Sequence, residues 1–238
     1  MPPKDDLFSL MREAFLGFKL QEESMVVVTS KIVSIWQGEC IEIKKGVSKD
    51  DLIRREADFY FTYKAKNPAR QVTLTLKNNI LVSAAGIDAS NANGYYILWP
   101  KRPFLAAKEI YGFIKKNYGL KKFGVIISDS RSNPLRLGIT GIGISYYGFE
   151  PLKDYRGAKD IFGRALQYSR TNVVDSLAAG AVFEMGEGNE QTPIAIIEDL
   201  HDIRFLDSDL KKKQRIEADK NTDMYAPLMR SVRWKKSK

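Results

Sequence analysis

The stretch Gly86-Ile87-Asp88-Ala89-Ser90-Asn91 carries an aspartate just beyond a short apolar run. Further along the chain, Val125-Ile126-Ile127-Ser128-Asp129-Ser130 has the same arrangement. Each aspartate falls where a strand is expected to end and a loop to begin. Carboxylates held there can converge on one hard cation such as Mg²⁺ or Mn²⁺, which prefers oxygen ligands and keeps waters and substrate phosphates in its remaining positions. An isolated aspartate before Ser or Asn also commonly caps a turn. The two stretches together favour metal-assisted phosphate chemistry, with turn capping as the alternative interpretation.

The composition is that of an ordinary globular protein. The chain has 238 residues, 44% of them hydrophobic, which suffices for one large domain or two small ones. The single cysteine, Cys40, cannot form an internal disulfide, and no N-terminal stretch has the pattern of a secretory signal, so we expect a cytoplasmic protein. The longest apolar stretches, near 25–36 and 177–185, are interrupted by polar residues and fall short of the roughly 20 residues that a membrane helix needs.

Positive charge is concentrated toward the C-terminus. The formal net charge is +9, and residues 205–238 contain ten Lys or Arg against five Asp or Glu. A basic surface can bind nucleic acid by releasing counterions, but a charged tail is more often solvated or disordered. We therefore divide the chain into a domain at 1–204 and a basic C-terminal tail at 205–238, and expect no nucleic-acid partner.

The pattern of helix and strand signals predicts an α/β, or mixed α+β, fold with mixed sheets and flanking helices. Helices are expected at 6–17, from an N-cap at Ser48, at 103–118 before Gly119, and from an N-cap at Thr171 to about Met185. Strands are expected at 25–34, 72–76, 80–84, 123–128, 138–147 and 193–197, with a hairpin turn at Asn78-Asn79.

Several kinds of chemistry are excluded by what the sequence lacks. His201 is the only histidine, so a zinc site with several His or Cys ligands is impossible and a Ser-His-Asp triad would have to use that residue. Neither a P-loop nor a Gly-x-Gly-x-x-Gly motif is present. The Gly-rich stretch Met185-Gly186-Glu187-Gly188-Asn189-Glu190 could bring backbone amides close to a phosphate, and Glu187 could add a third carboxylate, although such a stretch is usually only a helix C-cap.

In combination, five ordered segments resemble the coenzyme F420-0:L-glutamate ligase family, the γ-glutamyl ligases that extend the tail of a deazaflavin cofactor. The segments span roughly Asp6 to Asp199: Val28-Thr29-Ser30-Lys31-Ile32-Val33-Ser34, Ala85-Gly86-Ile87-Asp88-Ala89-Ser90-Asn91, Ile127-Ser128-Asp129-Ser130, Glu150-Pro151-Leu152-Lys153-Asp154-Tyr155-Arg156-Gly157 and Met185-Gly186-Glu187. The resemblance implies the family's γ-glutamyl ligase-like α/β fold, a homodimer of intertwined subunits, and a cleft for GTP with Mg²⁺ or Mn²⁺ and with K⁺ as a further cation.

The resemblance also implies roles for individual residues. Asp88 and Asp129 would bind the first metal ion, and Ser130 and Glu187 the second. The nucleotide would be bound by Ser30, Lys31, Asn91 and the loop formed by Met185, Gly186, Glu187, Gly188, Asn189, Glu190, Gln191 and Thr192. Lys31, Arg136 and Arg156 are candidates for the catalytic cations that neutralise charge during phosphoryl transfer.

The implied reaction is ligation of L-glutamate to a small carboxylate acceptor, coenzyme F420-0 or a related cofactor, through an acyl phosphate. The sequence departs from the family pattern after the second aspartate, at Ser130-Arg131-Ser132-Asn133-Pro134-Leu135-Arg136, where the family has a Gly-Arg-Pro stretch and an aromatic residue. An acid that the family often carries is also missing at Thr140-Gly141, so the acceptor pocket is expected to differ. The alternative hypothesis is a catalytically silent relative whose basic tail, with Tyr225 and Trp234 as stacking residues, binds a polyanion such as nucleic acid.

Overall fold

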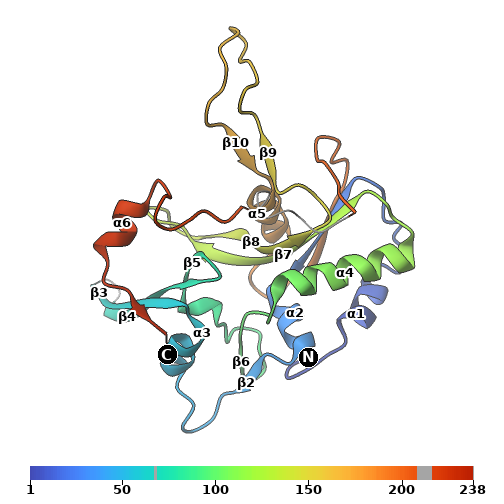
Figure 1. The fold of residues 1–238 in the computed structure, drawn as a ribbon. Helices are drawn as coiled ribbons and strands as arrows, with labels where there is room; N and C mark the ends of the chain where they lie inside the picture. Colours follow the sequence, from blue (N-terminus) through green and yellow to red (C-terminus); the bar gives the residue numbers. More distant parts are fainter. Residues whose placement is uncertain (67–68, 208–215, 238) are drawn as a thin grey trace.

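The chain is built around a four-stranded mixed sheet. The computed structural model describes residues 1–66, 69–207 and 216–237 (Figure 1). The strand order in this sheet is β11-β1-β7-β8, in which β1 and β7 are parallel and the other neighbours antiparallel. Its strands are β1 (Ser24–Thr29), β7 (Phe123–Ser132), β8 (Ile139–Tyr147) and β11 (Ile194–Ile197). The predicted mixed α/β fold is confirmed.

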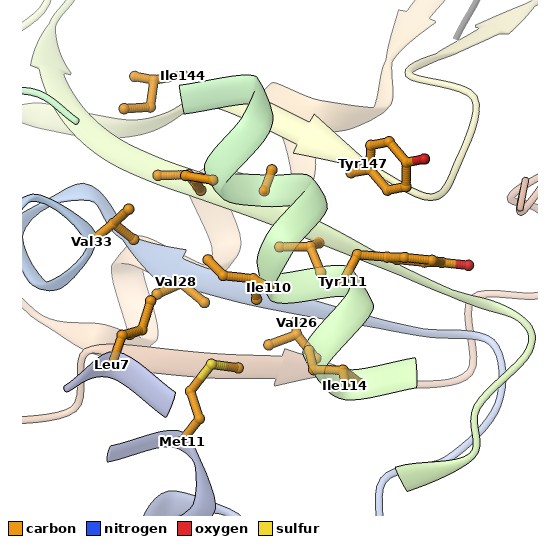
Figure 2. Packing of buried hydrophobic residues seen from close by; sticks show 14 of the residues in the cluster. Leu7, Met11, Val26, Val28, Val33, Ile110, Tyr111, Ile114, Ile144 and Tyr147 are labelled. Atoms are coloured by element: carbon orange, nitrogen blue, oxygen red, sulfur yellow. The ribbon is translucent and has the colours of Figure 1, made fainter. Parts of the chain in front are cut away.

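Helices cover both faces of this sheet. Alternate side chains of β1 point to opposite faces: Val26 and Val28 pack against one helix layer, and Met25 and Val27 against the other. The first layer consists of α1 (Leu7–Ala14), α2 (Ser30–Gln37) and α4 (Pro103–Tyr118), and the second of α5 (Val173–Met185). Figure 2 shows Ile110 and Ile114 of α4 above the sheet, with Leu7 and Met11 of α1 beside them. Burial on both faces explains the continuous apolar run in β1.

A second, antiparallel sheet has the order β12-β3-β4-β5. Its strands are β3 (Phe59–Lys66), β4 (Ala69–Lys77), β5 (Ile80–Ser83) and β12 (Lys235–Lys236). The predicted hairpin is confirmed: Asn78 and Asn79 have φ values of 50° and 62°, the left-handed conformation that a tight two-residue turn requires.

Two short strand pairs and three small helices complete the structure. The pairs are β2 (Cys40–Glu42) with β6 (Tyr95–Ile97), and β9 (Leu152–Asp154) with β10 (Arg170–Asn172). The helices are α3 (Lys49–Glu56), the 3₁₀ turn η1 (Ala84–Gly86) and α6 (Ala226–Ser231). The segment between β9 and β10 projects as an arm from the body of the protein (Figure 1).

Three helix boundaries follow the predicted signals. Helix α1 starts after Asp6, whose carboxylate accepts a hydrogen bond from the amide of Phe8. Ser48 caps α3 by accepting from the amide of Asp51 at 3.3 Å. Helix α4 ends at Gly119, which adopts φ 71°.

Several predicted boundaries are wrong. The helix expected at 6–17 ends at Ala14, because the chain turns over residues 15–17, where Gly17 has a φ of 78°. The strand expected at 25–34 ends at Thr29, and α2 begins at Ser30, because Val33 and Trp36, one helical turn apart, pack into the same core cluster and override the β propensity of the run. Asn172 rather than Thr171 caps α5, accepting from the amide of Asp175 at 3.1 Å, while Thr171 belongs to β10. Strand β7 does not end before Asp129 but continues to Ser132.

The basic C-terminal segment is anchored to the second sheet over its described part. Lys235 and Lys236 pair with Tyr60 and Phe59 of β3, and the amide of Ser237 donates to the carbonyl of Asp58 at 3.2 Å. The division of the chain at 204/205 stays a prediction. Within the described residues, no helix combines the length and apolar character that crossing a membrane requires.

Candidate active site

Asp88 lies in a tight turn between β5 and β6. The chain reaches it through three successive left-handed residues, Ala84, Ala85 and Gly86, and its backbone then bridges to Ile97. Oδ1 of Asp88 accepts hydrogen bonds from the amides of Ala89 at 2.6 Å and Ser90 at 2.9 Å. The aspartate therefore does cap a turn, but its carboxylate is also held at the edge of a cavity.

Lys31 contacts this carboxylate from the first turn of α2. Its Nζ lies 2.6 Å from Oδ2 of Asp88 and 2.9 Å from the carbonyl oxygen of Ser90. Burial is the largest influence on Asp88 and favours the neutral acid, but hydrogen bonds from Lys31 and Ser90 and the charge of Lys31 outweigh it and lower the pKa of Asp88 to about 2. Asp88 is therefore an anion at neutral pH.

Asp129 is placed by a bulge in β7. The register between β7 and β8 shifts between Ile127 and Ser128, which re-aims the following side chains. The carboxylate of Asp129 accepts hydrogen bonds from the indole N–H of Trp99 and, at 2.7 Å, from the amide of Ser130. Burial is again the largest influence, and here it raises the pKa of Asp129 to about 6, helped by the negative charge of Asp88 and only partly offset by hydrogen bonds from Ser130, Trp99 and Ser30.

Trp99 joins the two aspartate segments. It is 3% exposed, donates to Asp129 and lies against Gly86, where an added Cβ would be 2.0 Å from the indole nitrogen. Only glycine fits this position, because it also has a φ of 71°. The sequence contains no signal for this contact, since it depends on β6 folding back beside the Asp88 turn.

The Gly-rich loop 185–192 closes another side of the site. It follows the end of α5 and is shaped by its own hydrogen bonds, from the amide of Gly188 to Glu190 at 2.8 Å and from Thr192 Oγ1 to the carbonyl of Met185 at 2.8 Å. Asn91 Nδ2 donates to the carbonyl of Gly188 at 2.6 Å and so ties the loop to the Asp88 turn.

These elements enclose a cavity of about 770 Å³, which we call the active cavity. It brings together most of the residues predicted from the sequence: Ser30, Lys31, Asp88, Asn91, Asp129, Ser130 and the loop 185–192. Residues near the N-terminus, including Asp5 and Leu7, line it too and were not predicted.

Two predicted cationic residues lie outside the lining of the active cavity. Arg136 is exposed in the connection between β7 and β8. Arg156 lies at the base of the arm, where its Nε is 2.9 Å from Oδ1 of Asp154. Of the three candidates for the catalytic cations, this chain places only Lys31 at the cavity.

The donor set in the active cavity suits a hard cation. Asp88 and Asp129 supply carboxylate oxygens, and Ser130 and Glu187 line the same cavity. Within the described ranges, no three His, Cys, Asp or Glu side chains form a ready-made metal cluster. Mg²⁺ commonly needs only one or two protein carboxylates when substrate phosphates supply further oxygens, so the residues present fit a cation that binds together with a nucleotide.

The aromatic residues considered for polyanion stacking have other surroundings. Trp234 donates to the carbonyl of Met229 at 2.8 Å and packs edge-on to Phe61 with ring centroids 6.5 Å apart. Tyr225 is 55% exposed. His201, the only histidine, lies outside the active cavity and binds Glu23 at 2.8 Å.

Comparison with known proteins identifies the class of this fold and site. Residues 1–199 match the family described as F420-0:Gamma-glutamyl ligase. The chain is 30% identical to the coenzyme F420:L-glutamate ligase of Methanosarcina mazei over 91% of its own length and 89% of that protein. It is 32% identical to the protein of the same name from Methanococcus maripaludis, over 79% of this chain and 80% of the relative.

The matches place the chain among the ligases, enzymes that join two molecules. More narrowly, it belongs to the F420-0:gamma-glutamyl ligase family. The match to the family description ends at residue 199, before the C-terminal segment that pairs with β3, whereas the alignment with the Methanosarcina mazei protein covers 91% of the chain.

Proposed function

We propose that this protein is a GTP-dependent and Mg²⁺- or Mn²⁺-dependent ligase that joins L-glutamate to the carboxylate of coenzyme F420-0 or a related cofactor. The observation that carries the proposal is the shared cavity, in which Asp88, Asp129, Lys31 and the loop 185–192 face one space. The names of the relatives support the choice of substrates.

Asp88 and Asp129 would hold one divalent cation, and Ser130 and Glu187 a second, with K⁺ as a further cation of the site. When bound, such cations neutralise the charge that accumulates on transferring phosphate oxygens. The nucleotide would be bound by Ser30, Lys31, Asn91 and the backbone of the loop 185–192. Lys31 already lies 2.6 Å from Asp88, so it adds fixed positive charge at this edge of the cavity.

The reaction proceeds in two balanced steps. An oxygen of the acceptor carboxylate attacks the γ-phosphorus of GTP, the bond from that phosphorus to the β,γ-bridging oxygen breaks, and GDP leaves. The amine of glutamate then attacks the carbonyl carbon of the acyl phosphate, loses a proton and expels inorganic phosphate as the amide forms. Lys31 would stabilise negative charge in the first step, and the loop 185–192, which lines the cavity, would limit the access of water to the acyl phosphate.

We further propose that the protein is a homodimer and works in the cytoplasm. The arm between β9 and β10 exposes Ile161 and Phe162, which are 92% and 89% accessible in the single chain. Large apolar side chains at the tip of a projecting arm support burial against a second copy. The arm also carries Arg156, so dimerisation would decide which surface that residue meets.

The proposal is tested by ligand-dependent stability followed by product analysis. Thermal unfolding is measured with GTP or ATP, each with and without Mn²⁺, for the wild type, Asp88→Asn and Asp129→Asn. A ligand at 100 times its dissociation constant stabilises by about 2.7 kcal/mol, which at this size raises the melting temperature by roughly 5–10 °C. We expect a Mn²⁺-dependent shift with GTP that both variants lose, and glutamate addition to F420-0 by mass spectrometry. No shift under any combination would overturn the nucleotide site.

A further inference from the structure

A second cavity, of about 1030 Å³, lies at the C-terminal end of β7. Its wall is formed by the β4–β5 turn, the first turn of α4, the β7–β8 hairpin, the start of α5 and residues 216–229 of the C-terminal segment. This volume is at the upper end of the range found for small-molecule sites. The cavity is therefore large enough for an organic ligand of cofactor size.

Two buried polar atoms in its wall lack a hydrogen-bond partner among the residues that the structure describes. They are Oγ of Ser145, a residue that is only 4% exposed, and Nε of Arg131. A buried donor without a partner is costly, and a cationic one more so. Arg131 also has no ion pair within the described part of the chain. Ser145 and Arg131 are thus polar side chains in the cavity wall whose hydrogen bonding the described residues leave incomplete.

The rest of the wall favours a flat, largely apolar body. Phe104, Tyr146 and Tyr225 contribute aromatic rings, and Ile142 and Ile144 contribute aliphatic side chains. Acidic residues line the cavity too, but both carboxylate oxygens of Asp175 are occupied, by the amide of Gly143 at 3.0 Å and the side chain of Asn172 at 2.7 Å. Two further carboxylates, Glu217 and Asp223, and two further cations, Arg102 and Lys220, also line the cavity. The wall thus combines aromatic surface with several charged side chains, among which Arg131 has no ion pair within the described residues.

The two cavities are adjacent along one strand. Asp129 and Ser130 line the active cavity, and the next two residues of β7, Arg131 and Ser132, line the second cavity. Residues two apart in a strand point to the same face and lie about 7 Å apart. The second cavity therefore begins within one or two residues of the active cavity along β7.

We propose that the second cavity binds the body of the carboxylate acceptor, an organic acid with a flat ring system and a further negative charge, and that Arg131 binds that charge. This inference rests on the proposed function, because it takes the nucleotide to occupy the active cavity. It also assigns a role to the C-terminal segment, which is held over this cavity by hydrogen bonds from the amide of Ile216 to Tyr146 Oη at 3.3 Å and from Asn79 Nδ2 to the carbonyl of Ala218 at 2.5 Å. Part of the acceptor site then lies beyond the family match, which ends at residue 199.

The test is calorimetric titration of the full-length protein with coenzyme F420-0, without nucleotide. Arg131→Gln removes the charge, Arg131→Lys keeps it, and Leu228→Glu places a negative charge on the outer wall at a side chain that is already 64% exposed. Arg233→Gln is the matched control, since Arg233 is exposed and lines neither cavity. We expect binding to weaken about 10- to 100-fold in Arg131→Gln and measurably in Leu228→Glu, to recover partly in Arg131→Lys, and to be unchanged in Arg233→Gln.

Nucleotide binding separates failure of this inference from failure of the proposed function. Arg131→Gln should keep the Mn²⁺-dependent thermal shift with GTP and, in turnover, show a raised KM for F420-0 with little change in the KM for GTP. If the wild type binds GTP and forms product while Arg131→Gln and Leu228→Glu bind F420-0 as tightly as the wild type, the second cavity is not the acceptor site, although the ligase function stands. If the wild type binds no F420-0 by calorimetry, the assignment is overturned whatever the nucleotide result.

Discussion

The two aspartates of the active cavity have the same side chain but opposite electrostatic environments. Asp88 lies in a turn, 46% exposed at its side chain and bound to Lys31, and its pKa is lowered to about 2. Asp129 lies in a strand beneath Trp99, and burial raises its pKa to about 6. The turn therefore keeps its carboxylate charged at neutral pH, whereas the strand holds its carboxylate at a cost in stability.

The largest effect is expected from removing each charge in turn. Asp88→Asn and Asp129→Asn should each lower turnover by about 100-fold or more, because loss of even an outer partner of a metal site costs 10- to 100-fold. Steady-state ligation rates with saturating GTP and Mn²⁺ measure this, with Asp202→Asn, an exposed aspartate outside the active cavity, as the control. Full activity in Asp129→Asn would mean that only Asp88 takes part in turnover and that Asp129 has a structural role.

Gly86→Ala tests the contact between the Asp88 turn and Trp99, the residue that donates to Asp129. The new methyl group would meet the Trp99 indole at 2.0 Å on a backbone with φ 71°, so we expect a loss of about 2–4 kcal/mol in the free energy of unfolding. Gly94→Ala is the control, because Gly94 also has positive φ, 83°, but an added Cβ meets nothing within 4 Å; it should cost only about 1 kcal/mol. If chemical denaturation showed the same loss of unfolding free energy in both variants, the contact between Gly86 and Trp99 would not be what holds the Asp88 turn against Asp129.

The pH dependence of stability should separate the two aspartates. Asp129 has a native pKa of about 6, above its ordinary 3.8, so the native state binds more protons between these values and the free energy of unfolding falls as pH rises from about 4 to 6. Asp88 has a native pKa of about 2, so its contribution is present above pH 4 and is lost as pH falls through 2.

At pH 7 without metal, Asp129→Asn should therefore melt higher than the wild type, by roughly 2–4 °C, the shift that about 1 kcal/mol produces at this size. Asp88→Asn should melt lower. Thermal unfolding from pH 3.5 to 8 in EDTA measures both, and the gain of Asp129→Asn should shrink toward pH 4. A lower melting temperature for Asp129→Asn at pH 7 would contradict the conclusion that the charged Asp129 carboxylate destabilises the native state.

The smallest effect is expected at the contact between the Asp88 turn and the loop 185–192. Asn91→Gly removes the hydrogen bond to Gly188 while tolerating the φ of 50°, and it should weaken GTP binding about 3- to 10-fold. Asn117→Ala, which removes another exposed bond from an asparagine side chain to a carbonyl, should leave GTP binding unchanged. Calorimetry with GTP and Mn²⁺ compares the two variants. If both bound GTP as tightly as the wild type, the hydrogen bond between Asn91 and Gly188 would not contribute to nucleotide binding.

Much of the site could be predicted because its residues lie in contiguous segments with local signals. Asp88, Asp129 and the loop 185–192 each follow an apolar run, so local sequence singles them out, although β7 continues past Asp129 to Ser132 instead of ending before it. The mixed fold, the Asn78-Asn79 hairpin and the caps at Ser48 and Gly119 were readable for the same reason.

Other features depend on contacts between distant segments and left no local pattern. The bulge that aims Asp129 arises from pairing with β8, and Trp99 reaches Asp129 only because β6 returns beside the turn. The prediction for Arg136 and Arg156 rests on their charge, and charge alone does not determine where the β7–β8 hairpin and the arm place these side chains. The change from strand to helix at Ser30 has no local signal, because the β-branched residues of the run favour a strand and only tertiary packing makes its second half a helix.

Strand β12 also affects how far the second sheet is open to aggregation through its edge. Strand β3 lies between β4 and the two-residue edge strand β12, and an uncovered edge of backbone donors and acceptors is a template for pairing with other chains. Strand β12 covers the Phe59–Tyr60 end of that edge with two lysines, and Ser237 fastens it to the carbonyls of Asp58 and Arg54. The C-terminal segment thus adds two positive charges and a short paired strand at a place where β3 would otherwise present free backbone groups.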